Sequence, residues 1–179
     1  PVEFFAVISR IYGEFIRSVD MILAQPHHQL ETIHEVLSSH KIKRADNQTA
    51  RWLEKHPYHV KRSDKSFFVD KALSVKRQIT YNTKENRLTK YILRSTVQKL
   101  NEFRRNYIHL QRELDPEIID KIDGMIQGIN RRCNTGFLEN VSAMETSSGM
   151  SLVFSMAPGY RELYKCYLML LHGLSVTGD

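Results

Sequence analysis

The chain has few of the residues that mark several classes of protein. Its 179 residues include two cysteines, eight glycines and five prolines, which argues against a disulfide framework, a four-cysteine zinc site, a collagen-like chain and a low-complexity chain. Hydrophobic residues make up 41% and charged residues 26% of the sequence, as is typical of a folded globular protein. We therefore expect a cytoplasmic domain with a hydrophobic core and reduced thiols.

Long apolar runs are also missing. The first candidate run is interrupted by Arg10, Glu14, Arg17 and Asp20, whereas a membrane-spanning helix needs about 20 predominantly apolar residues. The sequence therefore predicts no membrane association. It opens with Pro1-Val2-Glu3 and without methionine, so we expect no cleavable signal and interpret the chain as a fragment of a larger protein.

Motifs for catalysis are absent as well. The sequence contains no GxGxxG or GxxxxGK[ST] phosphate loop, no GxSxG nucleophile elbow, and no acid-x-Lys pattern of a metal-dependent nuclease. His56 and His59 could ligate a metal, but Pro57 between them prevents a regular helical presentation. Cys133 and Cys166 are expected to be core residues. We predict no catalytic residue, metal or cofactor in this segment.

The positive charge is concentrated in the middle of the chain. Residues 41–112 hold 19 Lys or Arg against 6 Asp or Glu, whereas the rest holds 7 bases against 14 acids. Charge of one sign raises the local concentration of a polyanion. Nucleic acid is therefore one candidate partner, and an acidic protein surface, including the chain's own flanks, is the other.

The basic segment also contains aromatic residues that could stack on bases, namely Trp52, Tyr58 and Tyr81. No recognition-module signature accompanies them, so binding to DNA would be directed at the backbone and sensitive to salt. Two alternatives stay open: a protein-interaction scaffold with no nucleic-acid binding, and a segment that is itself a hydrolase. The cations predicted to contact DNA are Lys41, Lys43, Arg44, Arg51, Lys61, Arg62, Lys76, Arg77 and Arg87.

Apolar residues at three- and four-residue steps predict that most of the chain is helical. Short strands or loop anchors are possible at residues 67–69 and 79–81, and residues 147–149 are expected to form a surface loop. We predict one mainly α domain over residues 1–179, an irregular helical bundle with a long central helical hairpin and at most a few short strands. The expected helices cover residues 2–24, 30–37, 47–56, 85–114, 117–132, 137–141 and 160–172, with the fourth and fifth forming the hairpin.

Two stretches carry a resemblance to a known family. Residues 81–93, YNTKENRLTKYIL, resemble the DTxENRFxKxxL stretch of a bacterial family in which a domain of unknown function, DUF2357, precedes a PD-(D/E)XK nuclease domain. Residues 158–164, PGYRELY, are similar to its second landmark. Asn82 stands where the family commonly has Asp, and both residues cap helices. The residues that map onto the landmarks are Glu85, Asn86, Arg87, Pro158, Gly159, Tyr160 and Arg161.

The resemblance implies a McrC-like subunit of a modification-dependent restriction system, which cleaves DNA together with an AAA+ GTPase or ATPase partner in antiviral defence. Its nuclease domain would follow Asp179 and would use Mg²⁺ held by residues outside this sequence. The landmarks themselves favour structural roles. Glu85 and Asn86 suit the positive end of a helix dipole, Arg87 could pair with an acid or a phosphate, and Tyr160 would fill a core with its hydroxyl hydrogen-bonded.

Overall fold

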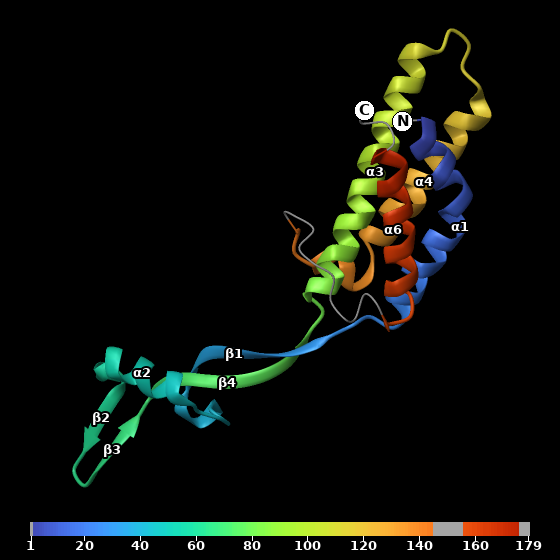
Figure 1. Cartoon of the computed structure of the whole chain (residues 1–179). Helices are drawn as coiled ribbons and strands as arrows, with labels where there is room; N and C mark the ends of the chain where they lie inside the picture. Colours follow the sequence, from blue (N-terminus) through green and yellow to red (C-terminus); the bar gives the residue numbers. More distant parts are fainter. Residues whose placement is uncertain (1, 145–155, 176–179) are drawn as a thin grey trace. The chain divides into compact units, whose positions relative to one another are not determined.

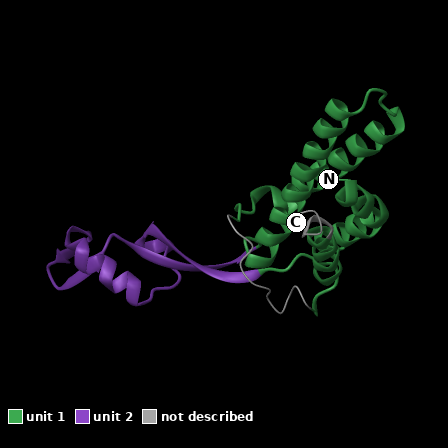
Figure 2. Ribbon diagram, turned by 45° about the horizontal axis from the view of Figure 1, so that its top comes forward, with its two compact units in different colours: residues 1–28, 81–179 green, residues 29–80 purple. Residues whose placement is uncertain are grey.

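A computed structural model describes residues 2–144 and 156–175 of the chain (Figure 1). The loop expected at residues 147–149 lies outside this description. The chain divides into two compact units (Figure 2): residues 1–28 with 81–179, and residues 29–80. The second unit is thus inserted into the sequence of the first. We call them the helical unit and the inserted unit.

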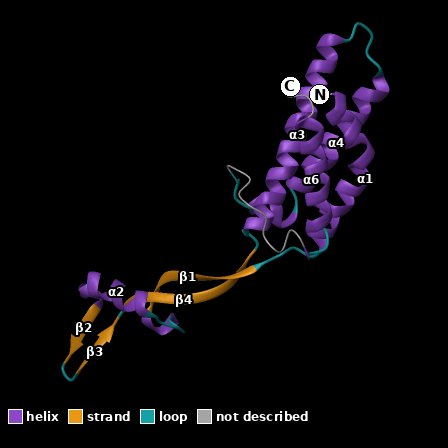
Figure 3. Cartoon of the chain, in the orientation of Figure 1, coloured by secondary structure: helices purple, strands orange, loops and turns teal. Residues whose placement is uncertain are grey.

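Among the described residues, four long helices run alongside one another and build the helical unit (Figure 3). The most extensive helix pairing joins the first and last of them, and α4 packs on α3. A short 3-10 helix, η3, follows α4. The elements are α1 (Val2–Ala24), α3 (Lys84–Leu110), α4 (Pro116–Cys133), η3 (Gly136–Asn140) and α6 (Tyr160–Ser175).

The helices begin where their capping residues predict. The Thr83 side chain accepts a hydrogen bond from the Asn86 amide at the start of α3. Asp115 accepts one from the Glu117 amide, and Pro116 takes the first position of α4, where a missing N–H costs nothing. Thr83 and Asp115 therefore confirm the predicted helix starts.

Apolar stripes from all four helices form one core. Cys133 and Cys166 lie within it as free, buried thiols, as the sequence predicted, and burial raises the pKa of Cys166 to about 11. The thiols are consequently packing residues rather than nucleophiles. Side chains with no exposed surface include Ile8, Phe15, Val19, Ile22, Ile92, Leu93, Leu100, Ile122, Ile129, Leu138 and Leu163.

A long antiparallel ribbon forms the body of the inserted unit. Strands β1 (Gln29–Ser38) and β4 (Lys71–Thr80) pair over all ten residues, with Gln29 opposite Thr80. A second pair, β2 (Val60–Ser63) with β3 (Ser66–Val69), makes a short hairpin. Helix α2 (Asn47–Lys55) packs on β4. The remaining elements are the 3-10 turns η1 (Ser39–Lys41) and η2 (Pro57–His59).

Local hydrogen bonds fix α2 on the ribbon. The Asp46 carboxylate accepts from the amides of Gln48 and Thr49, and the Thr49 hydroxyl accepts from the Asp46 amide in return. Thr49 is buried, and its hydroxyl also lies 2.8 Å from the Leu73 carbonyl oxygen, to which it donates. One threonine thus joins the helix start to β4.

The predicted fold class was wrong. Residues 30–37 were expected to be helical, yet they lie within β1, which pairs with a strand about forty residues further along the chain. No residue of β1 is buried, and its apolar residues Leu30 and Val36 are exposed, so no buried face imposes a clear two-residue alternation. The expected central hairpin does not organise the helices either, because α1 and α6 form the most extensive pair.

Candidate nucleic-acid interface

Eight of the nine cations predicted to contact DNA belong to the inserted unit, and all eight are exposed. This unit holds 11 Lys or Arg and 6 Asp or Glu, a net charge of +5, whereas the helical unit holds 15 against 14. The insertion therefore carries nearly all of the chain's net positive charge. The ninth residue, Arg87, lies half-buried on α3.

Acids neutralise few of these cations. Within residues 29–80, all of which the structure describes, Lys61 is the one predicted cation in an ion pair, with its Nζ 3.1 Å from Asp70 Oδ2. Two of the acids contact other groups: Asp46 Oδ2 lies 2.8 Å from His34 Nε2, and Glu31 accepts from Nε2 of the Gln78 side chain. Seven predicted cations thus stay available to an external anion.

Histidines set the ionisation of two acids in this unit. The hydrogen bond from His59 Nδ1, 2.9 Å from Asp70 Oδ1, lowers the pKa of Asp70 to about 2, with a further contribution from Lys61. The hydrogen bond with His34 likewise lowers the pKa of Asp46. Both carboxylates are therefore charged over the whole physiological range.

Three predicted lysines converge on one hollow of the ribbon. Lys41 and Lys43 follow β1, Lys76 lies on β4, and together with Glu35 they line a hollow of about 350 Å³. The Val75 amide donates to the Arg44 carbonyl at 3.0 Å and so holds the Lys41–Arg44 segment against β4. This cluster, three ammonium groups and one carboxylate, suits an anion.

The predicted stacking residues have different environments. Trp52 is half-buried, with its ring 4.2 Å from the His56 ring and 5.3 Å from the His59 ring. Trp52 therefore packs within the unit, and it also lines a hollow beside Arg51. Tyr58 is 66% exposed. Tyr81 belongs to the helical unit, where its ring lies 5.5 Å from that of Phe137.

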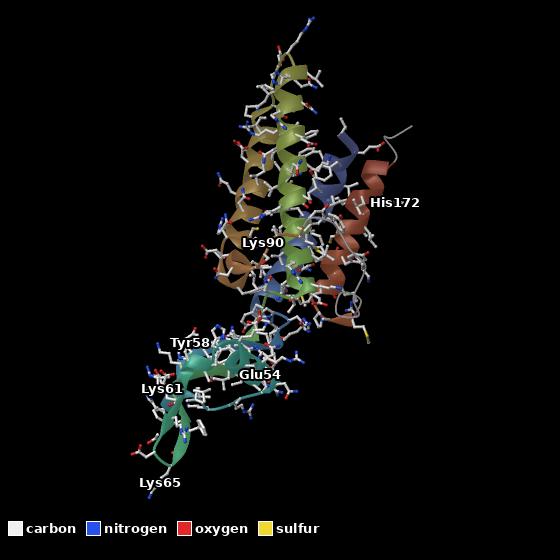
Figure 4. The ribbon with its side chains drawn as sticks, turned by 90° about the vertical axis from the view of Figure 1, so that its left-hand side faces the viewer. Glu54, Tyr58, Lys61, Lys65, Lys90 and His172 are labelled. Carbon is white, nitrogen blue, oxygen red and sulfur yellow. The ribbon has the colours of Figure 1, made fainter. Side chains whose placement is uncertain are left out.

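The β2–β3 hairpin presents aromatic residues that sequence reasoning did not assign to the site. Phe67 is 74% and Phe68 50% exposed. Arg62 Cζ lies 6.0 Å from the centre of the Phe67 ring. Figure 4 shows Lys61 on this hairpin and Lys65 at its tip. Two consecutive aromatics on a strand point to opposite faces, and that pattern could have indicated a ring exposed to solvent on an isolated hairpin.

The family landmark Asn86 lies at the centre of a buried hydrogen-bond network in the helical unit. Its Nδ2 donates to the carbonyl oxygens of His27 at 2.8 Å and Tyr81 at 2.7 Å. The Tyr160 hydroxyl donates to Asn86 Oδ1 and accepts from the His27 amide at 2.8 Å, and burial raises the pKa of Tyr160 to about 12. Asn86 thus binds both chain segments that connect the helical unit to the insertion.

The second family landmark, residues 158–164, approaches α1 closely at Gly159. Gly159 has φ +83°, and a Cβ there would lie 3.0 Å from the Ser18 carbonyl oxygen. Its amide donates to Glu162, which also pairs with Arg161 at 2.9 Å. Pro158 is exposed. These residues build the turn before α6.

The remaining landmark groups and a nearby lysine are also held within the helical unit. Glu85 is buried, with Oε2 3.3 Å from His27 Nδ1. Lys90 is 5% exposed and donates to the carbonyl oxygens of Glu139 and Val141 at 3.0 and 2.7 Å (Figure 4). This charge in the basic segment therefore fixes η3 to α3 and cannot meet DNA.

The described residues form neither a candidate metal cluster nor a helix suited to spanning a membrane. Among residues 2–144 and 156–175, no three His, Cys, Asp or Glu side chains come together in a way that could hold a metal ion. Over the same residues, no helix has the length and apolar character to cross a membrane.

The two units together define a helical host with a basic β-rich insertion. The family model described as a domain of unknown function, DUF2357, matches residues 1–167 of this architecture. The chain therefore belongs to the DUF2357 family, as the residues at 81–93 and 158–164 indicated. No curated protein and no solved structure matches it.

Proposed function

We propose that this chain is a non-catalytic module whose inserted unit binds the backbone of DNA. One observation carries the proposal: seven exposed cations that make no ion pair within residues 29–80 lie on a unit of net charge +5, whereas the helical unit is almost neutral. Each lysine or arginine that meets a phosphate releases condensed counterions, so affinity should fall steeply with salt. The hollow with Lys41, Lys43 and Lys76 is the place where several charges act on one phosphate segment.

The same unit supports a second candidate, docking to a protein. Leu30 and Ile79 lie directly opposite each other on the ribbon and are 70% and 53% exposed. Cross-strand apolar pairs of this kind suit a protein surface. The partner implied by the sequence resemblance is an AAA+ GTPase or ATPase subunit, so the alternative is an interaction scaffold without nucleic-acid binding.

We further propose a McrC-like parent protein in a bacterial restriction or antiviral defence system. The support is the likeness of residues 81–93 and 158–164 to family members that continue into a PD-(D/E)XK nuclease domain. In that setting a Mg²⁺-dependent endonuclease domain follows residue 179, and the present segment supplies DNA contacts or a connection to the motor subunit. Sequencing the codons downstream of Asp179 tests this, because an acid followed by Glu-x-Lys on a predicted strand is required there.

Charge reversal on the inserted unit tests DNA binding. The variant R44E/R62E/R77E is compared with R10E/R94E/R105E, which reverses three exposed arginines of the helical unit that make no ion pair with any described residue. Both variants change the net charge equally. We expect the first to lose roughly tenfold or more in duplex affinity at 50 mM salt, because each lost phosphate contact lowers affinity and salt dependence. The second should change affinity less than about threefold by the same reasoning.

Fluorescence anisotropy with a labelled 20-base-pair duplex measures both affinities at several salt concentrations. Equal losses of duplex affinity in the two variants would show that binding depends on net charge alone and not on the inserted unit. Unchanged binding by R44E/R62E/R77E would remove the DNA interface altogether. A wild-type chain that ignores DNA but co-purifies with the ATPase through Leu30 and Ile79 would establish the scaffold instead.

A further inference from the structure

The register of the β2–β3 hairpin sorts its side chains into two faces. Arg62 lies directly opposite Phe67, and Lys61 lies directly opposite Phe68. Residues opposite each other on antiparallel strands point to the same face, and consecutive residues point to opposite faces. One face of the hairpin therefore carries Arg62 with Phe67, and the other carries Lys61 with Phe68.

The two faces differ in free charge and in exposed aromatic surface. Lys61 is paired with Asp70, a carboxylate that also accepts from His59. Arg62 has no carboxylate within ion-pair distance in the inserted unit, whose residues are all described, and its guanidinium lies 6.0 Å from the Phe67 ring centre. Phe67 is also the more exposed ring, at 74% against 50% for Phe68. An unpaired cation thus adjoins the most exposed aromatic ring of the hairpin.

We propose that the Arg62–Phe67 face of the hairpin binds an unpaired nucleobase, with the base stacked on Phe67 and an adjacent phosphate held by Arg62. This proposal rests on the proposed DNA-binding function and specifies which form of DNA the hairpin prefers. A base in a paired duplex already stacks on both neighbours and presents only its edges. Single-stranded or locally unpaired DNA offers the base face that an exposed ring requires.

Charge decides between a nucleic acid and a protein pocket as occupant. An apolar pocket could take the Phe67 ring, but it would then desolvate the Arg62 guanidinium without a partner, which is costly. A nucleotide supplies both groups at once, a flat apolar base and an anionic phosphate. Lys65 at the hairpin tip adds a second exposed cation on the same short element.

The test compares two neighbouring substitutions in the full chain, F67A and F68A. They remove the same side chain from consecutive positions on opposite faces. Anisotropy is measured with a labelled 20-nucleotide thymidine oligomer and with a 20-base-pair duplex. Because stacking on an aromatic side chain contributes about 1–3 kcal/mol per base, we expect F67A to weaken single-strand binding by roughly 5- to 100-fold. Duplex binding by F67A, and both affinities of F68A, should change less than about twofold.

A spectroscopic readout separates stacking from a structural effect. F67W should restore single-strand affinity, and its fluorescence should be quenched by the oligomer, whereas F68W should show little quenching. The proposal is overturned if F67A binds the oligomer like wild type, if F68A loses as much, or if F67A loses equally on both substrates. Each of those outcomes is compatible with salt-dependent duplex binding by the wild-type chain. Failure of the wild-type chain to bind either DNA instead overturns the proposed function and this inference with it.

Discussion

At the scale of single residues, Asn86 shows how one family landmark can be required without meeting a ligand. Its side-chain amide joins three groups whose residues are far from one another in sequence: the His27 carbonyl, the Tyr81 carbonyl and the Tyr160 hydroxyl. An asparagine is needed because the site demands two donated hydrogen bonds and one accepted bond from a single flat group. Aspartate has no N–H to donate, and leucine has neither donor nor acceptor.

Replacing Asn86 by alanine should destabilise the helical unit. The substitution leaves two carbonyl oxygens and a hydroxyl without this partner, and each unsatisfied buried group costs about 1–3 kcal/mol. We expect a loss of about 3 kcal/mol in the free energy of unfolding, measured by urea denaturation with circular dichroism. The control is N101A, which changes an exposed asparagine of the same helix. Similar stability of the two variants would contradict the structural role of Asn86.

Gly159 provides a second residue-scale prediction. An alanine there would adopt a left-handed φ of +83° and place its Cβ 3.0 Å from a backbone oxygen of α1. We expect G159A to lose about 1–3 kcal/mol of stability. Gly13 of α1 is the matched control because a Cβ there meets nothing within 4 Å. G13A should gain about 0.5–1 kcal/mol from its higher helix propensity, so thermal melts should move in opposite directions.

At the scale of elements, sequence reasoning succeeded where the signals are local. Thr83 and Asp115-Pro116 are local signals for the first residues of α3 and α4. The apolar stripe of α1 likewise predicts a helix from its own residues. Sequence reasoning failed for β1, whose pairing with β4 depends on residues about forty positions away. Phe67 was missed for a related reason: the Phe67-Phe68 pair indicates rings on opposite faces of a strand, but whether another element covers either face depends on the fold.

The candidate site was only partly accessible to the same reasoning. Composition located the basic segment, and eight of the nine predicted cations do lie on the inserted unit. Composition could not reveal that Lys90 binds backbone carbonyls inside the helical unit, or that Arg104 pairs with Asp123 at 2.7 Å. Both charges make tertiary contacts, and whether they are free to bind DNA depends on how α3 packs against its neighbours.

Acid should lower the stability of the inserted unit because Asp70 becomes protonated. Its pKa of about 2 lies below the unfolded value of about 3.9, so its contribution is complete above pH 4 and is lost as pH falls toward 2. Trp52, the single tryptophan of the chain, reports this unit by fluorescence. Thermal melts between pH 2 and 5 should be less pH-dependent for D70N than for wild type. D64N, which changes an acid of the hairpin turn, should keep the wild-type slope.

At the scale of the whole molecule, the insertion begins and ends at neighbouring points of the helical unit. The His28 and Tyr81 rings lie 6.0 Å apart, and Asn86 binds the carbonyls of both His27 and Tyr81. The host core contains none of the residues between these points. Folding of the helical unit should therefore not require residues 29–80.

Excision of the insertion tests that separation. A chain in which a short Gly-Ser link replaces residues 29–80 should retain helical circular dichroism and cooperative unfolding, because its core is unchanged and the link spans adjacent ends. DNA affinity should fall to background because net charge drops from +6 to +1. Loss of the cooperative transition would show that the two units depend on each other for folding.

The two hydrogen bonds by which Asn86 holds the His27 and Tyr81 carbonyls also have an evolutionary consequence. Because one side chain secures both the departure and the return of the polypeptide, an exchange of everything in between leaves the host's folding determinants in place. The sequence and binding target of the inserted unit can therefore change at a different rate from the sequence of the helical unit. Comparison of homologues should then find residues 29–80 diverging fastest, while Glu85, Asn86 and Arg87 at the start of α3 stay nearly constant.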